Sequence, residues 1–252
     1  MKPVTPATPS TGEPNRRLRA VGQAGPLSVI ALSLVLVVLM GINGEAHGVS
    51  GADALFLQGI TGAAIGPLMY LGAKHMVTGY DHLAFLVGVI FFLYRLKDVV
   101  LYVSLFTIGH SITLLAGVLG GIQANPYIVD AIIGASVVYK ALDNMGVFPT
   151  VLGVRPDARV AVLVFGLAHG FGLASKLQAF ALPASGLVTN IVSFNAGVEI
   201  GQVIALSGVF ALLTVWRARP GFVRHAFATN TMLMAVGLLL VGYQLSGFFL
   251  ES

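Results

Sequence analysis

The sequence of 252 residues contains no cysteine and few charges, and each absence removes a class of protein. Without cysteine, disulfides, thiolate metal sites and iron–sulfur clusters are excluded, so any metal site must use nitrogen and oxygen ligands. Only 10% of the residues are charged, whereas soluble domains carry about 25%. With 56% hydrophobic residues, the composition predicts a polytopic membrane protein without a large soluble domain.

The formal net charge is +4, but the basic residues lie in short clusters between apolar runs, a pattern that orients membrane helices. We therefore expect the lipid bilayer as a partner and no nucleic acid. The sequence also lacks a nucleotide-binding motif, so this chain has no means of its own to drive a process with ATP.

The chain divides into three regions. Residues 1–46 combine a basic tail with an apolar run from Leu27 to Met40, and Gly44 and Ala46 have the spacing of a signal-peptidase site. This region is predicted to be a signal peptide or a retained signal anchor, and both interpretations remain open. Residues 47–67 are predicted as an outer-face segment, and residues 68–252 as the transmembrane domain.

Six segments of the third region are long enough to span a bilayer, and short connections join them. They cover residues 68–94, 98–119, 126–146, 159–182, 187–215 and 226–249. The predicted fold is therefore all-α: a polytopic membrane helix bundle of six core transmembrane helices, preceded by the N-terminal signal peptide or anchor helix.

Alternate connections carry all the basic residues between these spans. The connections GGIQANP and LPASG contain no lysine or arginine, and the basic positions of the other three are Arg95, Lys97, Arg155, Arg159, Arg217, Arg219 and Arg224. The positive-inside rule then places the basic connections in the cytoplasm and the C-terminus outside. We expect a multi-pass protein of a bacterial inner membrane.

Ionisable and amide side chains within the spans are the candidate functional residues, because such groups are costly in hydrocarbon without a role. Neutral imidazole with carboxylate and carbonyl oxygen fits Ni(II), Co(II) or Zn(II) better than Cu(I). We expect such a metal as substrate and no organic cofactor. The predicted metal ligands are His75, Asp81, His82, His110, His169, Asn195, Glu199 and Gln202.

Helical spacing relates these ligands to one another. His75 and His82 are seven residues apart, ~10.5 Å on a regular helix, which is too far for one ion to bind both directly. Either they are successive stations on a path, with His75 near the outer surface, or Gly79 breaks the helix and brings them closer. Asn195, Glu199 and Gln202 are predicted to share one helix face.

Other polar and small residues have structural interpretations. Gly166 and Gly170 have the spacing of a close helix contact. Asp143 follows Lys140 by three residues, which is typical of an intrahelical ion pair. Lys176, near the end of its span, is expected to extend its amine outward to the membrane surface, as is Lys74.

Four motifs resemble those of the HupE/UreJ family of membrane proteins, in the same order over about residues 70 to 249. They are His75 with Asp81-His82 and LAFLVGV, then FTIGHSITLLAG, FGLAHGFGLA and FNAGVEIGQ. The resemblance implies a secondary nickel or cobalt permease linked to metalloenzyme maturation proteins, with His75, Asp81, His82 and His169 important for metal passage. Gly166 and Gly172 stand near where the nickel-permease branch has a further histidine and an acid, so the chain looks like the other branch.

The predicted function is therefore a secondary transporter that moves a divalent transition-metal cation into the cytoplasm, and not an enzyme. A haem-binding electron carrier using His82, His110 and His169 is one alternative. A rhomboid-like intramembrane serine protease is another, with Ser136 in GAS and His169 in AHGFG as its pair. A homo-oligomer is left open.

Overall fold

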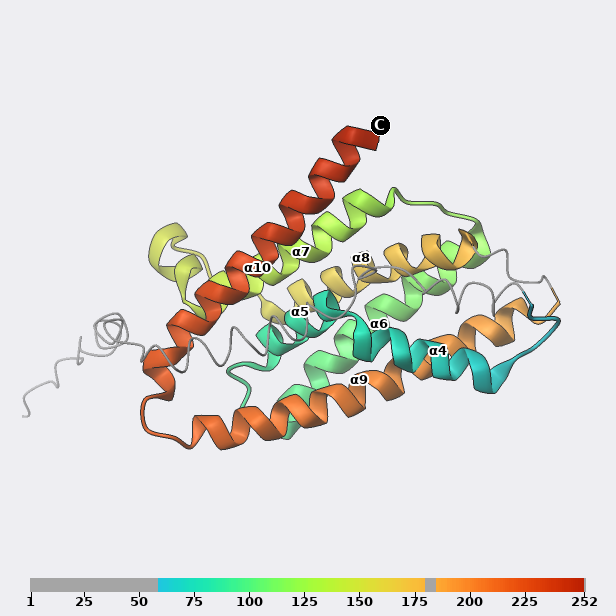
Figure 1. Cartoon of the computed structure of the whole chain (residues 1–252). Helices are drawn as coiled ribbons and strands as arrows, with labels where there is room; N and C mark the ends of the chain where they lie inside the picture. Colours follow the sequence, from blue (N-terminus) through green and yellow to red (C-terminus); the bar gives the residue numbers. More distant parts are fainter. Residues whose placement is uncertain (1–58, 180–184, 252) are drawn as a thin grey trace, which may run out of the picture.

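The computed structural model describes residues 59–179 and 185–251, and these fold into helices joined by short connections (Figure 1). The described part contains no strand, so the all-α prediction is confirmed there. Residues 1–46 and most of 47–67 lie outside the described part, so the signal peptide or anchor is untested. The elements are α4 (Ile65–Thr78), α5 (Tyr80–Ile90), α6 (Leu96–Gly120), α7 (Pro126–Asn144), the π-helical segment η1 (Phe148–Leu152), α8 (Ala158–Ala179), α9 (Leu187–Arg217) and α10 (Phe222–Glu251).

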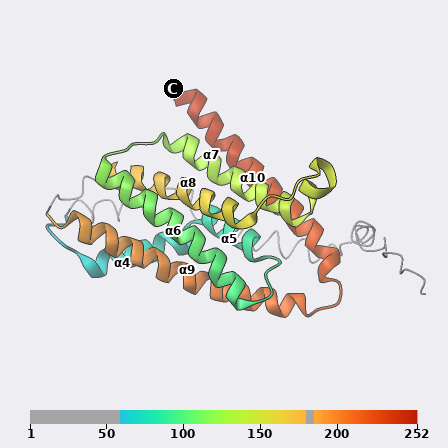
Figure 2. The same cartoon turned by 180° about the vertical axis from the view of Figure 1, so that it is seen from behind.

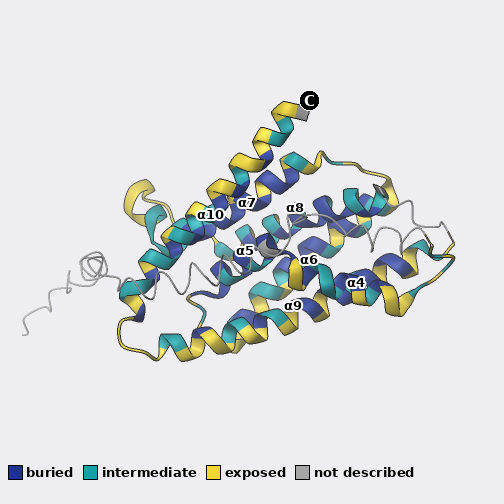
Figure 3. Ribbon diagram, viewed as in Figure 1, coloured by how far each residue is buried: buried dark blue, intermediate teal, exposed yellow. Residues whose placement is uncertain are grey.

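Three helix pairs make the most extensive contacts of the bundle: α4 with α9, α6 with α8, and α7 with α10. The short helix α5 contacts α7 and, less extensively, several other helices, and both views show it between the longer ones (Figures 1 and 2). Buried residues lie mainly on the parts of the helices that face the inside of the bundle, and exposed residues on the outer parts (Figure 3). Large apolar residues such as Leu212, Leu239 and Phe249 cover those outer surfaces, which suits contact with lipid.

Glycines lie where the paired helices approach each other most closely. A Cβ atom on Gly166 would collide with the carbonyl group of Phe106, and one on Gly170 with that of His110. These two glycines therefore pack α8 against α6, as their spacing predicts. Gly197 brings α9 equally close to Met69 of α4. The approach of α7 to α10 at Gly134 is less close, because a Cβ atom there would lie 3.0 Å from Val241.

The first predicted span, 68–94, is interrupted. It consists of α4 and α5, separated by Gly79, whose φ of −75° and ψ of 90° end one helix and begin the next. A Cβ at Gly79 would lie 3.0 Å from the carbonyl oxygen of His75 and 3.1 Å from Nδ1 of His82. Because Gly79 has no side chain, the helix can be interrupted at this position without a collision, inside an otherwise apolar segment.

The other five predicted spans agree with α6, α7, α8, α9 and α10 to within a few residues. Four helices are long and apolar enough to cross a membrane by themselves: α6, α8, α9 and α10. Helix α5 is a shorter apolar helix, and α7 carries Asp130, Lys140 and Asp143. By length and composition the described part therefore contains four candidate membrane spans, fewer than the six predicted.

Arg217, the last residue of α9, holds the C-terminal end of α5. Its guanidinium donates to the carbonyl oxygens of Ile90 at 2.5 Å, Phe91 at 2.8 and 3.2 Å, and Leu93 at 2.8 Å. It also lies 4.8 Å from the ring centroid of Tyr94. The last carbonyl groups of a helix have no partner within it, so Arg217 satisfies acceptors that α5 leaves open.

We expect Arg217→Ala to lower the free energy of unfolding by about 2 kcal/mol, because several charge-assisted hydrogen bonds are lost together. Thermal unfolding of the purified protein in detergent would measure this loss. Arg219→Ala, at an exposed position two residues on, is the matched control. Equal unfolding of both variants would show that Arg217 does not hold α5.

Candidate metal-binding site

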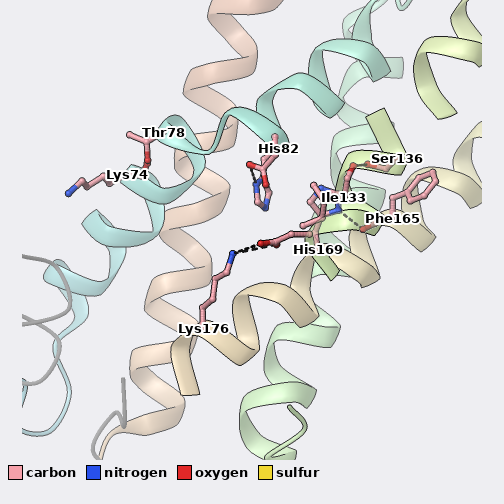
Figure 4. Close-up of polar contacts among 10 residues, drawn as sticks. Lys74, Thr78, His82, Ile133, Ser136, Phe165, His169 and Lys176 are labelled. Carbon is pink, nitrogen blue, oxygen red and sulfur yellow. Dashed lines mark hydrogen bonds and ion pairs between the residues drawn. The ribbon is translucent and has the colours of Figure 1, made fainter. Parts of the chain in front are cut away.

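Three imidazoles from three helices lie next to one another in the middle of the bundle. The ring centroid of His82 on α5 is 5.2 Å from that of His75 on α4 and 4.8 Å from that of His169 on α8. Figure 4 shows the side chains of His82 and His169 extending toward each other. His110 on α6 is also buried and stacks on Phe106, whose ring lies 4.9 Å from His169. We call these four histidines the imidazole cluster.

The break at Gly79 forms this cluster. On a continuous helix His75 and His82 would be separated by ~10.5 Å along the axis, but their rings are adjacent in the structure. Of the two arrangements that the sequence left open, the structure therefore has the broken helix. The separation of ~10.5 Å that a continuous helix would give these two histidines is therefore wrong.

Hydrogen bonds orient two of the imidazoles. Nδ1 of His82 lies 2.8 Å from Oδ1 of Asp81, and Nδ1 of His169 lies 2.6 Å from the carbonyl oxygen of Phe165 (Figure 4). A carboxylate and a carbonyl accept hydrogen bonds, so Nδ1 carries the proton in each neutral ring and the lone pair is on Nε2. This is the arrangement by which carboxylates and carbonyls prepare histidines as metal ligands.

Five buried ring nitrogens of the cluster have no hydrogen-bond partner within the described residues. Buried polar atoms in proteins are nearly always hydrogen-bonded, so a group of unpaired ones marks a place for a ligand or water. Most of the unpaired buried atoms in this protein are of types that can accept hydrogen bonds or bind cations. The buried side-chain atoms without a hydrogen-bond partner are Nε2 of His75, His82 and His169, both ring nitrogens of His110, Oδ1 of Asn195 and Nε2 of Gln202.

The spacing of the rings bears on how an ion could bind. Three imidazoles around one tetrahedral ion have ring centroids about 5 Å apart, given metal–nitrogen bonds of about 2.0 Å. The two distances centred on His82 match that value. However, within residues 59–179 and 185–251 no three His, Asp or Glu side chains are already arranged to hold a metal ion together. The cluster therefore offers separate imidazole nitrogens in close succession, not a preformed closed cage.

The side-chain amides of two residues on α9 form hydrogen bonds with α6 beside the cluster. Asn195 donates to Oγ of Ser111 at 2.7 Å, and Thr107 donates to Oε1 of Gln202 at 3.2 Å. Gln202 is buried and Asn195 is half-buried. The role of Ser111 was not predicted, because an isolated serine in an apolar helix gives no signal of its partner.

Glu199 is not brought into this group. It is exposed on α9, whereas Gln202 is buried and Asn195 is half-buried, so the expected carboxylate flanked by two amides is not formed inside the bundle. A residue turns by 100° per position in a helix, which places Glu199 about 60° from Gln202 around the axis. Gly197 and Gly201 pack against α4 and fix the rotation of α9, so that Glu199 faces outward.

Two ion pairs involve α7. Lys140 and Asp143 form the predicted pair within the helix, at 2.5 Å. Lys176 of α8 does not extend to the membrane surface as expected, because its ammonium is 3.2 Å from Oδ2 of Asp130. Lys74, by contrast, points away from His82 and His169 (Figure 4).

The geometry gives no support to the two alternatives. The rings of His82 and His169 meet edge to face with centroids 4.8 Å apart, which leaves no room for a porphyrin between them. The Ser136 hydroxyl donates to the carbonyl oxygen of Ile133 at 2.6 Å, while Nδ1 of His169 is bonded to Phe165. The hydrogen-bonded serine–histidine pair of a serine protease is thus not formed by these two residues.

Apolar helices of spanning length around a buried polar cluster define the class as a multi-pass membrane protein. A family model described as HupE / UreJ protein matches residues 51–252, and the chain belongs to the HupE/UreJ family, as its motifs predicted. This family of membrane proteins is associated with nickel or cobalt uptake or an accessory role in it. No curated protein and no solved structure matches the chain.

Proposed function

We propose that this protein is a secondary permease for a divalent transition-metal cation, with nickel and cobalt as its first candidate substrates. One observation carries the proposal: the rings of His75 and His169 each lie next to that of His82 beside the break between α4 and α5, and each of the three has a buried Nε2 without a described partner. Discontinuous helices supply the binding sites of many secondary transporters near the middle of the membrane. Neutral imidazole is a good ligand for nickel, cobalt and zinc.

In this proposal α4 and α5 together cross the membrane once, and α7 also crosses it, so that the core has six spans. Buried partners compensate the charges of α7, as Lys176 does for Asp130. The basic connections, including that around Arg95 and the one after Arg217, then lie in the cytoplasm of a bacterium. The C-terminus is outside.

The ion passes from one imidazole to the next. It enters from the outer side and meets His75, His82 and His169, and His110 of α6 lies at the level of Gly170, the neighbour of His169 on α8. Separate ligands in succession suit passage better than a closed cage, because an ion held by all of them at once would leave slowly. The membrane potential favours inward movement by ~2.3 kcal/mol per charge per 100 mV. Metal ligands must be deprotonated, and a neutral imidazole meets this condition without releasing a proton.

Uptake by the purified full-length protein in liposomes tests this function. We expect nickel and cobalt to accumulate, with an initial rate that rises with an inside-negative potential, because the cation carries its charge across the membrane. Competition among nickel, cobalt and zinc then ranks the substrates. Accumulation no greater than in protein-free liposomes, for all three metals, would contradict the proposal.

A further inference from the structure

The ion pair between Asp130 of α7 and Lys176 of α8 joins two helices next to the imidazole cluster. Lys176 Nζ lies 3.4 Å from Oδ1 and 3.2 Å from Oδ2 of Asp130. The Asp130 side chain is only 6% exposed and that of Lys176 is 22% exposed. Both hydrogen bonds described for this carboxylate come from the same ammonium group.

Such a pair is poorly suited to stabilising the fold. Its distances exceed the roughly 2.7–2.9 Å of a strong charge-assisted bond. Removing two charges from water is costly, and a buried pair offsets that cost only with close geometry and further hydrogen bonds. A nearly buried carboxylate with one loosely held cation is instead a site at which one cation can replace another.

The position of Lys176 connects this site to the cluster. It follows His169 by seven residues, two helical turns or ~10.5 Å, so both side chains leave the same face of α8. Helical side chains lean toward the N-terminus of their helix, which directs Lys176 back toward His169. Figure 4 shows its ammonium extending toward the space beside His82 and His169.

The pair lies toward the end of the bundle at which α6 ends and α7 begins. Asp130 is the fifth residue of α7, and Lys176 is three residues before the end of α8. In the orientation proposed above this is the outer side. A cation approaching from outside therefore meets this pair before it reaches His169.

We propose that Asp130 is a cation-binding carboxylate on the entry side of the imidazole cluster, and that Lys176 is the tethered cation that occupies it when no metal ion is bound. An entering divalent ion displaces the ammonium from Asp130. Once the ion has moved to the imidazoles, Lys176 returns, and its charge opposes movement back to the outside. The inference rests on the proposed permease function and names a further residue pair in it.

Charge removal is expected to act in different ways at the two positions. Asp130→Asn leaves the ammonium without its carboxylate beside the imidazoles, so uptake should fall at least about tenfold by repulsion of the cation. Lys176→Gln leaves the carboxylate open, so KM and the maximal rate should both fall, each by about tenfold, because the ion enters readily and leaves slowly. The double variant removes both charges and should recover part of the uptake lost in Asp130→Asn.

The matched control is the other ion pair of α7. The variant Lys140→Gln with Asp143→Asn removes a pair within one helix, and its uptake should stay within about twofold of the unaltered protein. If Asp130→Asn and this control have the same uptake and KM, the inference is wrong.

The absence of cysteine permits a chemical test with two readouts, the KM of uptake and the rate of the thiol reaction, and the second does not depend on transport. In Lys176→Cys, 2-aminoethyl methanethiosulfonate restores an ammonium at position 176, whereas the methyl reagent adds a neutral group. We expect only the aminoethyl group to restore KM. We also expect nickel to slow modification of Lys176→Cys but not of Lys176→Cys with Asp130→Asn, since the ion binds Asp130 beside the thiol.

The two kinds of failure are distinguishable. If the unaltered protein takes up no metal but nickel still slows the thiol reaction through Asp130, the permease function fails and the cation site stands. If uptake is normal but nickel has no effect on the thiol reaction and both reagents act equally, the exchange site at Asp130 is wrong while the permease function stands.

Discussion

Replacing His82 with alanine is expected to lower metal uptake at least about a hundredfold, the largest effect of any single ligand. Among the described residues, His82 is the imidazole in ring contact with two others, His75 and His169. Its Nε2 is buried without a partner there, and its Nδ1 is already bonded to Asp81. Its loss therefore removes the ligand that links the helices, and uptake at saturating and limiting metal should measure it.

Asp81→Asn should have a smaller effect, about ten- to a hundredfold, because it weakens the orientation of His82 but keeps the imidazole. His225→Ala is the matched control, since His225 lies near the start of α10, outside the cluster. Thermal unfolding should be similar in all three variants. Normal uptake by well-folded His82→Ala would remove the imidazole cluster from the route.

Replacing Gly197 with leucine is expected to destabilise the protein by about 3 kcal/mol or to prevent its folding, because an overpacked contact cannot relax without moving a helix. A Cβ at this position would collide with the backbone of Met69, so α4 and α9 would have to separate. The movement would also shift His75, which is on α4. Thermal unfolding in detergent measures the effect.

Gly208, on the same helix, provides the matched comparison, because a Cβ atom there would have no described atom within 4 Å. Gly208→Leu should change the free energy of unfolding by less than about 1 kcal/mol. No contact is lost there, and the higher helix propensity of leucine compared with glycine acts in the stabilising direction. Equal losses in the two variants would show that the close contact of α4 with α9 does not stabilise the bundle.

The sequence predicted most of the helices, because apolar length and the flanking basic and turn residues determine where a membrane helix begins and ends. Helix α7 begins at Pro126, with Asn125 capping the amide of Tyr127, as a proline after a capping residue favours. The contact of Gly166 and Gly170 with α6 was also predictable from their spacing.

The sequence predicted most of the residues of the site but not how they are arranged. A glycine within an apolar run is compatible with a continuous helix, so the break at Gly79 had to remain an alternative. Whether Glu199 faces inward depends on the rotation of α9, which its packing against α4 determines. The partner of Lys176 is on another helix, 46 positions away in the sequence, and no local pattern indicates it.

The central claim is that imidazoles from separate helices bind the transported ion at the break between α4 and α5. X-ray absorption by the cobalt-loaded, purified protein tests it most directly, because imidazole ligands produce a characteristic scattering signal. We expect at least two imidazoles around cobalt in the unaltered protein and a loss of imidazole signal in His82→Ala. A shell of oxygen atoms alone, or the same spectrum from both proteins, would contradict the claim.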